Sequence, residues 1–295
     1  MKKWLLLTTL FVLSTVAQSQ ITNKNSVKDI LIRCDDIGMC HSVNMAAKKV
    51  LDSGFPVSMS VMVPCPWFSE AAEMLKQYKN VTVGIHLTLN SEWKQYRWGP
   101  VAGAGTVPSL VDSSGHFFPS RSKLFGNQPK MSEIETELRA QIEKALNAGL
   151  KVEYLDYHMS APMQTPETRA IVIKLAKEYK LMISRFLGEQ DVEGWYFANP
   201  EDKPDSIRQS LSKTKVGITN LLVFHVGLQS AEMDAMEDLN PFGPREMSKH
   251  RQGELEGLLS LPYKELPESK KYRFINYSML IKEKGLENMK SPFTE

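Results

Sequence analysis

Short hydrophobic runs alternate with amphipathic stretches along most of the chain. Runs rich in β-branched residues predict buried strands, and apolar residues spaced three or four apart predict helices between them. Strands are expected at residues 29–34, 57–63, 81–87, 151–157, 181–186, 218–224 and 272–277. Helices are expected at residues 42–53, 67–78, 132–149, 166–180, 206–213 and 247–259. This alternation favours one α/β domain with a parallel sheet and right-handed crossovers.

Local signals predict where several of these elements begin and end. Ser42 is expected to cap one helix at its N-terminus, and Gly54 to end it. Ser132 and Glu135 match a capping box, and Pro166 suits the first position of a helix. Stretches without periodicity are expected to form long loops, at residues 90–130, 187–204 and 238–247.

The N-terminus has the pattern of a secretory signal peptide. Two lysines precede an apolar run at residues 4–16, and Ala17-Gln18-Ser19 provides a small-x-small cleavage site. The apolar run is shorter than the ~20 residues that a transmembrane helix needs. We therefore assign residues 1–19 to a signal peptide and residues 20–295 to a single domain. That domain is expected to be periplasmic or secreted, without a membrane span.

Composition and charge narrow the class of partner. The chain is 42% hydrophobic and 24% charged, as is typical of globular proteins. Its formal net charge of +2 falls to zero when the two signal-peptide lysines are removed, so a nucleic-acid partner is not expected. Three cysteines leave at least one free thiol, with a Cys40–Cys65 bridge left open. The absence of a C-x-x-C pair argues against a thiolate zinc site.

Polar residues lie where four of the predicted strands end. Asp35 and Asp36 follow the first strand, and His86, His158 and His225 lie at the ends of three later strands. In a parallel α/β barrel those ends converge on one face. A single histidine of this kind would more often be structural, but three of them with two carboxylates indicate a site. One carboxylate with two imidazoles suits a divalent cation, and a second carboxylate is then free to act as a base.

These residues belong to longer motifs. The motifs are Cys34-Asp35-Asp36-Ile37-Gly38 with Asn44, Ser58–Pro64, Val83–Leu89, Leu155–His158, Phe224–Gly227 and Arg251 with Glu254. Together, from about residue 28 to 277, they resemble the YdjC-like, or chitooligosaccharide deacetylase-like, carbohydrate deacetylases. The resemblance implies a distorted TIM-like (β/α) barrel of about seven parallel strands in a single domain.

The resemblance also assigns chemical roles. It implies that Asp36, His86 and His158 bind one divalent cation, Mg²⁺ or Zn²⁺. Asp35 would be the general base that activates water, and His225 the general acid or the group that stabilises the oxyanion. The implied reaction is hydrolysis of an N-acetyl group on an amino sugar or short oligosaccharide, which releases acetate.

Further residues are candidates for binding the carbohydrate. Trp93 and Trp98 lie in the aromatic-rich loop, where rings could stack on sugar faces. The aromatic residues alone favour a simpler interpretation, in which they pack the loop onto the body of the domain. The closing motif of the family adds Arg251 and Glu254 as candidates.

Three alternatives remain open at this point. The enzyme could cleave acetyl esters, it could be a carbohydrate-binding protein that has lost catalysis, or the strand-end histidines could be incidental to a structural barrel. Loss of catalysis predicts a missing base or ligand, whereas all five residues are present. The chain departs from the family at Ser160 and Val226, which indicates a changed substrate preference. A homodimer is also left open.

Overall fold

The computed structural model describes residues 27–241, 243–261, 263 and 271–293. The signal peptide expected at residues 1–19 lies outside this part of the chain. None of the helices within the described ranges is long and apolar enough to cross a membrane. The cysteines Cys34, Cys40 and Cys65 are all buried and unpaired, so the Cys40–Cys65 bridge left open above is not formed in this structure.

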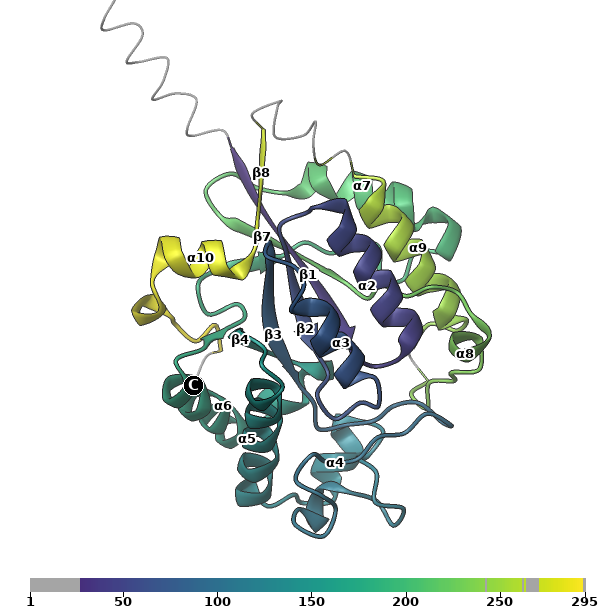
Figure 1. The fold of residues 1–295 in the computed structure, drawn as a ribbon, viewed down its shortest axis with the longest axis vertical. Coiled ribbons are helices and arrows are strands. Elements are labelled where there is room, and N and C mark those ends of the chain that lie inside the picture. The colour runs from purple at the N-terminus through teal and green to yellow at the C-terminus, as the bar shows by residue number, and fades with distance from the viewer. Residues whose placement is uncertain (1–26, 242, 262, 264–270, 294–295) are drawn as a thin grey trace, which may run out of the picture.

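The centre of the molecule is a curled sheet of parallel strands (Figure 1). The strands are β1 (Lys28–Ile37), β2 (Val57–Val61), β3 (Val81–Leu87), β4 (Val152–Tyr157), β5 (Met182–Ile183), β6 (Glu189–Asp191), β7 (Thr219–Phe224) and β8 (Tyr272–Ile275). Seven of them follow the order β5-β4-β3-β2-β1-β7-β6, and β8 pairs with the beginning of β1. No pairing joins β5 to β6 among the described residues, so the sheet is a half-barrel. This confirms the expected distorted TIM-like barrel.

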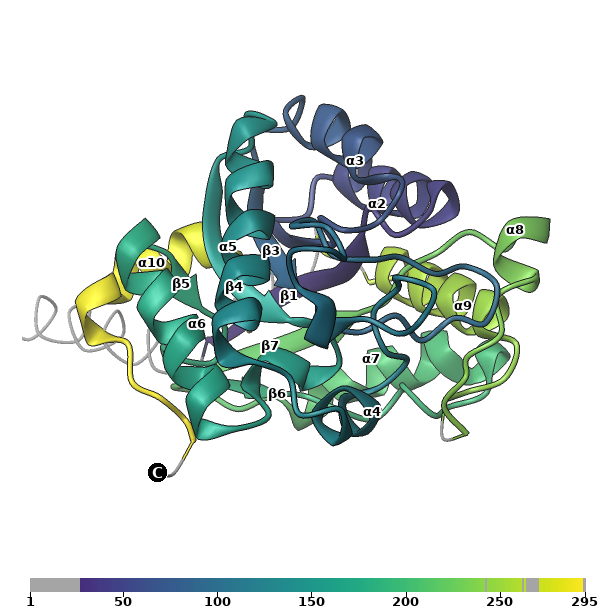
Figure 2. The ribbon, with the colours of Figure 1, turned by 90° about the horizontal axis from the view of Figure 1, so that it is seen from below.

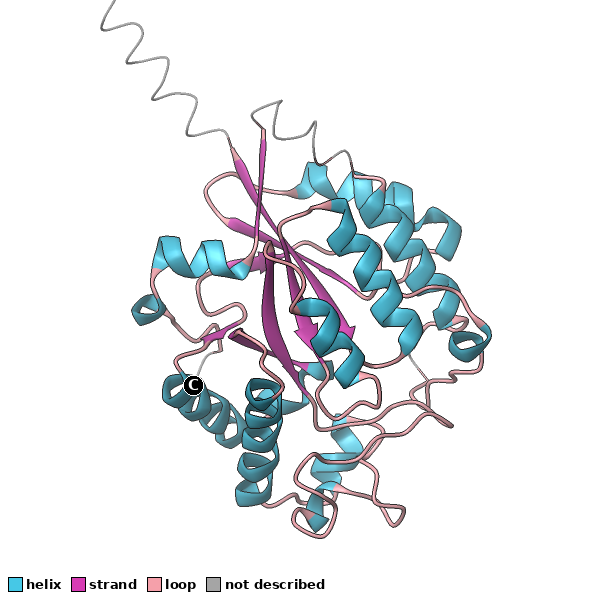
Figure 3. Ribbon diagram, in the orientation of Figure 1, coloured by secondary structure: helices cyan, strands magenta, loops and turns pink. Residues whose placement is uncertain are grey.

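Helices surround the strands on the outside (Figures 2 and 3). They are α2 (His41–Ser53), α3 (Phe68–Leu75), α4 (Arg121–Gly126), α5 (Met131–Asn147), α6 (Pro166–Tyr179), α7 (Lys203–Lys213), α8 (Ala231–Asp234), α9 (Met247–Leu259) and α10 (Tyr277–Lys284). Short 3-10 helices are η1 (Pro108–Leu110), η2 (His158–Met163), η3 (Pro200–Asp202) and η4 (Leu286–Asn288). Helices α2, α5, α6 and α9 pack against the strands, α7 packs against α9, and α10 contributes Tyr277 and Leu280 to the smaller of two apolar clusters.

Two apolar clusters fill the two sides of the sheet. The larger lies between strands and helices, and the smaller is inside the half-barrel, where it includes Leu31, Tyr154 and Tyr277. Gly84 of β3 makes room for the Tyr154 ring, because a Cβ at Gly84 would lie 2.3 Å from Tyr154 Cζ. Side chains alternate along a strand, so Leu31, Arg33 and Asp35 share a face. The inner face therefore changes from apolar to polar towards the carboxyl ends of the strands.

Two of the expected helix starts are wrong. Helix α2 begins at His41 with Cys40 as its N-cap, and Ser42 Oγ instead lies 2.7 Å from Ser230 Oγ. Ser132 lies inside α5, which begins at Met131 without a side-chain cap. The neighbouring Glu133 is buried, and its carboxylate accepts hydrogen bonds from the backbone N–H and the hydroxyl of Ser109. A long-range contact thus takes the Ser42 hydroxyl that a local cap would use.

Other local signals are confirmed, and the expected loops are more ordered than predicted. Gly54 ends α2 in the left-handed region with φ of 83°, and Pro166 is the first residue of α6. The stretch 187–204, expected to be a loop, contributes β6, which pairs in parallel with β7. The strand expected at 181–186 is reduced to β5, because Arg185 has a φ of 74° and turns the chain. Helices η1 and α4 lie within the stretch 90–130.

Candidate metal centre

The site begins at an irregularity in the first strand. The pairing of β1 with β2 shifts register between Cys34 and Ile37, and Asp36 has a φ of 63°. In a regular strand Asp35 and Asp36 would point to opposite faces, but a bulge re-aims side chains. Both carboxylates consequently line the same cavity. Aspartate is among the residues that tolerate the left-handed region best.

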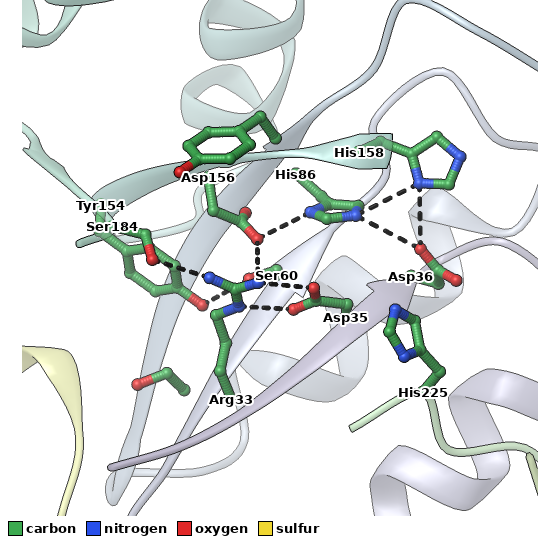
Figure 4. Close-up of polar contacts among 12 residues, drawn as sticks. Arg33, Asp35, Asp36, Ser60, His86, Tyr154, Asp156, His158, Ser184 and His225 are labelled. Carbon is green, nitrogen blue, oxygen red and sulfur yellow. Dashed lines mark hydrogen bonds and ion pairs between the residues drawn. The ribbon is translucent and has the colours of Figure 1, made fainter. Parts of the chain in front are cut away.

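Asp36, His86 and His158 present three donor atoms to one another (Figure 4). Asp36 Oδ1 lies 3.4 Å from His86 Nε2 and 3.4 Å from His158 Nδ1. The two ring nitrogens are 3.3 Å apart. The three residues come from the ends of β1, β3 and β4, and all are buried. The structure therefore brings together the three residues that the sequence proposes as metal ligands.

This triangle of donors fits a divalent cation. Ligand atoms held about 2.1 Å from a tetrahedral ion lie roughly 3.4 Å from one another, close to the three observed separations. Asp36 Oδ1 is buried and has no hydrogen-bond partner within the described residues. An unpaired buried oxygen is costly unless something positive approaches it. One carboxylate and two imidazoles suit zinc and related ions, and the carboxylate also suits magnesium.

Each of the two histidines is oriented by a further carboxylate of its own. His86 Nδ1 lies 2.8 Å from Asp156 Oδ2, and His158 Nε2 lies 3.0 Å from Glu92 Oε2. Burial lowers the pKa of His86, but Asp156 and Asp35 outweigh it and raise that pKa to about 10. Burial likewise lowers the pKa of His158, and Glu92 among other groups raises it to about 9. The site thus attracts positive charge, and its carboxylates fix the rings as in many metal centres.

Arg251 holds the other oxygen of the Asp36 carboxylate. Its Nη2 donates a hydrogen bond of 2.6 Å to Asp36 Oδ2, which leaves Oδ1 facing the histidines. Burial raises the pKa of Asp36, but the Arg251 charge and the nearby His158 and His86 rings lower it well below its usual range. Arg251 Nε and Nη1 are buried without partners in the described part of the chain. Arg251 therefore lies beside the proposed ligands and also lines the cavity.

Asp35 is held by a buried arginine. Arg33 Nε donates to Asp35 Oδ1 at 2.6 Å, and Nη2 donates to Oδ2 at 2.7 Å. The same guanidinium lies 3.2 Å from Asp156 and donates to Ser184 Oγ at 2.7 Å. Burial raises the pKa of Asp35, but Arg33 and the nearby histidines outweigh it and lower that pKa below its usual range. Asp35 is therefore an ionised carboxylate in a fixed orientation (Figure 4).

His225 follows β7 and lines the cavity beside Asp36 (Figure 4). Its side chain is 29% exposed, and its Nδ1 lies 4.0 Å from Glu254 Oε2. Glu254 is buried outside the cavity lining, where it accepts hydrogen bonds from the backbone N–H of His225 and from Lys203 Nζ. The structure thus places Glu254 behind His225, and its predicted contact with substrate stays a prediction.

The two candidate tryptophans are buried. Trp93 is 1% exposed, lines the cavity and lies under the Arg251 guanidinium at 6.0 Å. Trp98 is 3% exposed, and its ring meets that of His158 edge-on at 6.3 Å. Packing thus accounts for most of their surface, as the simpler interpretation expected. The cavity, which Trp93 lines and Trp98 does not, has a volume of about 1400 Å³.

Four further residues organise this site and were not predicted as site residues: Arg33, Glu92, Asp156 and Ser184. Two of them carried a signal, because Arg33 precedes Asp35 by two residues and Asp156 precedes His158 by two residues. Residues two apart in a strand face the same side, so both were candidates to point into the barrel. Glu92 lies in an irregular segment, where no periodicity indicates direction, and Ser184 lies directly after the short strand β5.

Comparison with known proteins gives consistent matches. The model of the YdjC-like protein family matches residues 29–268. A carbohydrate deacetylase from Brevibacillus brevis is 33% identical over 154 residues, which cover 52% of this chain and 58% of that protein. A carbohydrate deacetylase from Thermus thermophilus is 31% identical over 153 residues, which cover 52% of each chain. The matched segment thus spans about half the length of these curated relatives.

A solved structure shares the fold over most of the chain. It belongs to a protein of Enterococcus faecalis V583 described as a candidate cellobiose-phosphate cleavage protein. The TM-score is 0.69 at 21% sequence identity, and the match covers 86% of this chain and 99% of the other. At that identity the likeness establishes the fold and nothing further.

Proposed function

Because the chain belongs to the YdjC-like protein family, we propose that it is a metal-dependent carbohydrate deacetylase. Its substrate would be an N-acetylated amino sugar or short oligosaccharide, and its products acetate and a free amine. The observation that carries the proposal is the triangle of Asp36 Oδ1, His86 Nε2 and His158 Nδ1, which opens onto the large cavity. The names of the two relatives support the choice of substrate class.

Asp36, His86 and His158 would hold the cation, and Asp35 would act as the base. A bound divalent cation supplies Lewis acidity, which polarises the acetyl carbonyl and makes water more acidic. Asp35 remains ionised, and each of its oxygens accepts one N–H from Arg33, which leaves lone pairs for a proton from water. The lowered pKa makes Asp35 a weak base, so its contribution depends on position more than on basicity.

His225 would complete the reaction from the other side of the cavity. The amine that departs from the acetyl carbon needs a proton, and the His225 ring lies in the cavity wall beside Asp36. Its Nδ1 lies 4.0 Å from Glu254 Oε2, so the buried carboxylate stands behind the ring. The Arg251 Nη1 group, buried without a partner in the described structure, is a candidate donor to a substrate oxygen.

Cellular location and assembly belong to the same proposal. Export to the periplasm or the medium rests on residues 1–19, outside the described residues. The homodimer stays a prediction.

Acetate release is the direct test. The purified protein would be incubated with N-acetylated and O-acetylated mono- and oligosaccharides, with Zn²⁺ or Mg²⁺ and with chelator. We expect acetate from N-acetylated sugars, loss of activity with chelator, and recovery when metal is restored. Release only from O-acetylated sugars would identify an ester deacetylase instead. No release from any sugar, in a protein that holds metal, would contradict the proposal.

A further inference from the structure

Two aromatic rings stand exposed at the rim of the cavity. Phe197 is 77% exposed and Tyr196 is 41% exposed, and both line the cavity. We call these two residues the aromatic rim. Phe197 is the most exposed large hydrophobic residue in the described part of the chain. The two candidate tryptophans, Trp93 and Trp98, are instead buried.

The aromatic rim stands on a fixed support. Lys203 is fully buried, and its Nζ donates hydrogen bonds of 3.0 Å to the carbonyl oxygens of Trp195 and Tyr196. Trp195 is itself buried, and its ring stacks on that of Phe224 with centroids 5.0 Å apart. Burying an ammonium group costs free energy unless the group is paired and hydrogen-bonded, and the hydrogen bonds of Lys203 meet that condition. The backbone beneath the rim is therefore held in place.

The same support reaches the proposed catalytic centre. Lys203 Nζ also donates to Glu254 Oε1 at 2.9 Å, and Glu254 Oε2 accepts the backbone N–H of His225 at 2.7 Å. Gly253 allows helix α9 to approach this segment, because a Cβ there would lie 2.4 Å from the carbonyl oxygen of Pro200. The rim and His225 are thus fixed by one buried carboxylate.

The rings form a continuous path outwards from His225. The Tyr196 ring lies 5.9 Å from the His225 ring, and the Phe197 ring lies 4.8 Å from that of Tyr196 at an interplanar angle of 87°. The path therefore leads from the proposed proton donor to the exposed face of Phe197. A group bound at the metal triangle and extended past His225 would next meet this ring.

We propose that the aromatic rim is a second sugar-binding subsite, where a pyranose ring linked to the reacting sugar packs against Phe197. This inference rests on the proposed deacetylase function and adds the residues that recognise the neighbouring sugar. The C–H groups on one face of a pyranose form an apolar surface, which packs well on an aromatic ring. Phe197 has no hydrogen-bonding group, so the subsite recognises the shape of the ring. It selects chains of at least two sugars over a single sugar.

The test compares substrate lengths in the metal-loaded enzyme. Kinetic constants for deacetylation would be measured with N-acetylglucosamine and with its β-1,4-linked dimer and trimer. We expect Phe197→Ala to raise KM for the dimer and trimer roughly three- to tenfold, as loss of one aromatic contact would. KM for the single sugar should not change. Phe197→Tyr keeps the ring and should keep the wild-type preference.

The matched control is Val216→Ala, which also truncates an exposed apolar side chain but lies before β7, at the opposite end of the strands from the cavity. It should alter none of the constants. If acetate is released and Phe197→Ala keeps the wild-type ratio of dimer to monomer, the subsite is wrong and the deacetylase proposal stands. If no sugar is cleaved, titration calorimetry would measure how tightly the wild type and Phe197→Ala bind the dimer, and that comparison tests the subsite separately. Weaker binding by Phe197→Ala would support the subsite, and equal or absent binding would overturn it.

Discussion

At the scale of single residues, adjacent carboxylates have different environments. Asp36 is turned by its positive φ and is shared between Arg251 and the two histidines. Asp35 points to the same face of β1 as Arg33 and accepts two hydrogen bonds from it. Each carboxylate therefore has an arginine of its own, Arg251 for Asp36 and Arg33 for Asp35. This division underlies the different roles proposed for them.

The first prediction separates these roles by substitution. Asp35→Asn should retain metal and lose activity by about 10²- to 10⁴-fold, which is the usual contribution of a general base. His86→Ala should lose both metal and activity, because it removes a corner of the donor triangle. Metal content by elemental analysis and acetate release by a coupled assay would be measured on the same samples. An Asp35→Asn enzyme with full activity would refute the assignment of the base.

The second prediction concerns Arg33. Arg33→Met leaves the buried Asp35 carboxylate without its arginine and Asp156 with His86 alone, and we expect a loss of about 3–5 kcal/mol in the free energy of unfolding. Ser184→Ala is the control, since it removes one hydrogen bond from the same guanidinium and should cost only about 1 kcal/mol. Denaturant unfolding followed by circular dichroism would measure both. Equal effects would mean that the ion pairs contribute little.

At the scale of elements, helix α5 does more than cover the sheet. Besides its apolar face it carries a buried polar stripe of Glu133, Glu137 and Gln141. Glu137 accepts hydrogen bonds from the backbone N–H groups of Val101 and Ala102 and from Gln141. Gln141 in turn bonds the backbone of Thr88, two residues after His86. The stripe thus fixes the loop that carries Glu92 and Trp93.

The third prediction tests this stripe. Glu137→Ala leaves two backbone N–H groups unpaired and should destabilise the fold by about 1–3 kcal/mol. Glu73→Ala is the matched control, because Glu73 is an exposed helical glutamate whose side chain pairs only with Lys76 in the described structure. It should change stability by less than about 0.5 kcal/mol. Thermal unfolding of the two variants would give the comparison.

The pH dependence of the Glu137 contribution has a definite sign. Burial raises the pKa of Glu137, although the N–H groups of Ala102 and Val101 and the Gln141 side chain oppose it. The folded state therefore binds this proton more tightly than the unfolded state, and stability from Glu137 falls as pH rises from about 4.3 through the folded pKa. The cost of Glu137→Ala should accordingly be smaller at pH 7 than at pH 4. A cost that grows with pH would contradict the raised pKa.

At the scale of the whole molecule, the sheet assembles the site. Asp36, His86, His158 and His225 come from the ends of β1, β3, β4 and β7, which are separated by 50 to 72 residues in sequence. A cation held by the first three would link β1, β3 and β4 at one end of the half-barrel. Since the unfolded chain lacks such a site, binding should stabilise the folded state.

The fourth prediction is a shift in melting temperature on metal loading. At a cation concentration of 100 times Kd the folded state gains about 2.7 kcal/mol. For a chain of this size that corresponds to roughly 5–10 °C. Scanning calorimetry of the chelated and reloaded protein would measure the shift, and His86→Ala should abolish it. An equal shift in His86→Ala would show that the cation binds elsewhere.

Much of the architecture could be predicted from the sequence because it rests on local patterns. Strands and helices alternate with the hydrophobic periodicity, and the polar residues at strand ends follow from where each apolar run stops. The helix start at Ser42 was wrong because the Ser42 hydroxyl contacts Ser230. The start at Ser132 was wrong because α5 begins at Met131, with Glu135 paired to Arg139 and Lys174. The strand β6 was missed because three residues carry too little periodicity to show it.

The sequence by itself therefore determined the α/β barrel and the set of five charged and imidazole side chains at one end of it. Spacing along the chain establishes that these residues lie at strand ends. Only the tertiary structure decided which partners Asp35 and Asp36 have. The bulge at Asp36 and the hydrogen bonds from Arg33 to Asp35 depend on how the neighbouring strands pack. It also decided that Trp93 and Trp98 are buried while Phe197 is exposed. The burial of a side chain depends on which parts of the chain pack against it, and the order of residues alone does not specify that packing.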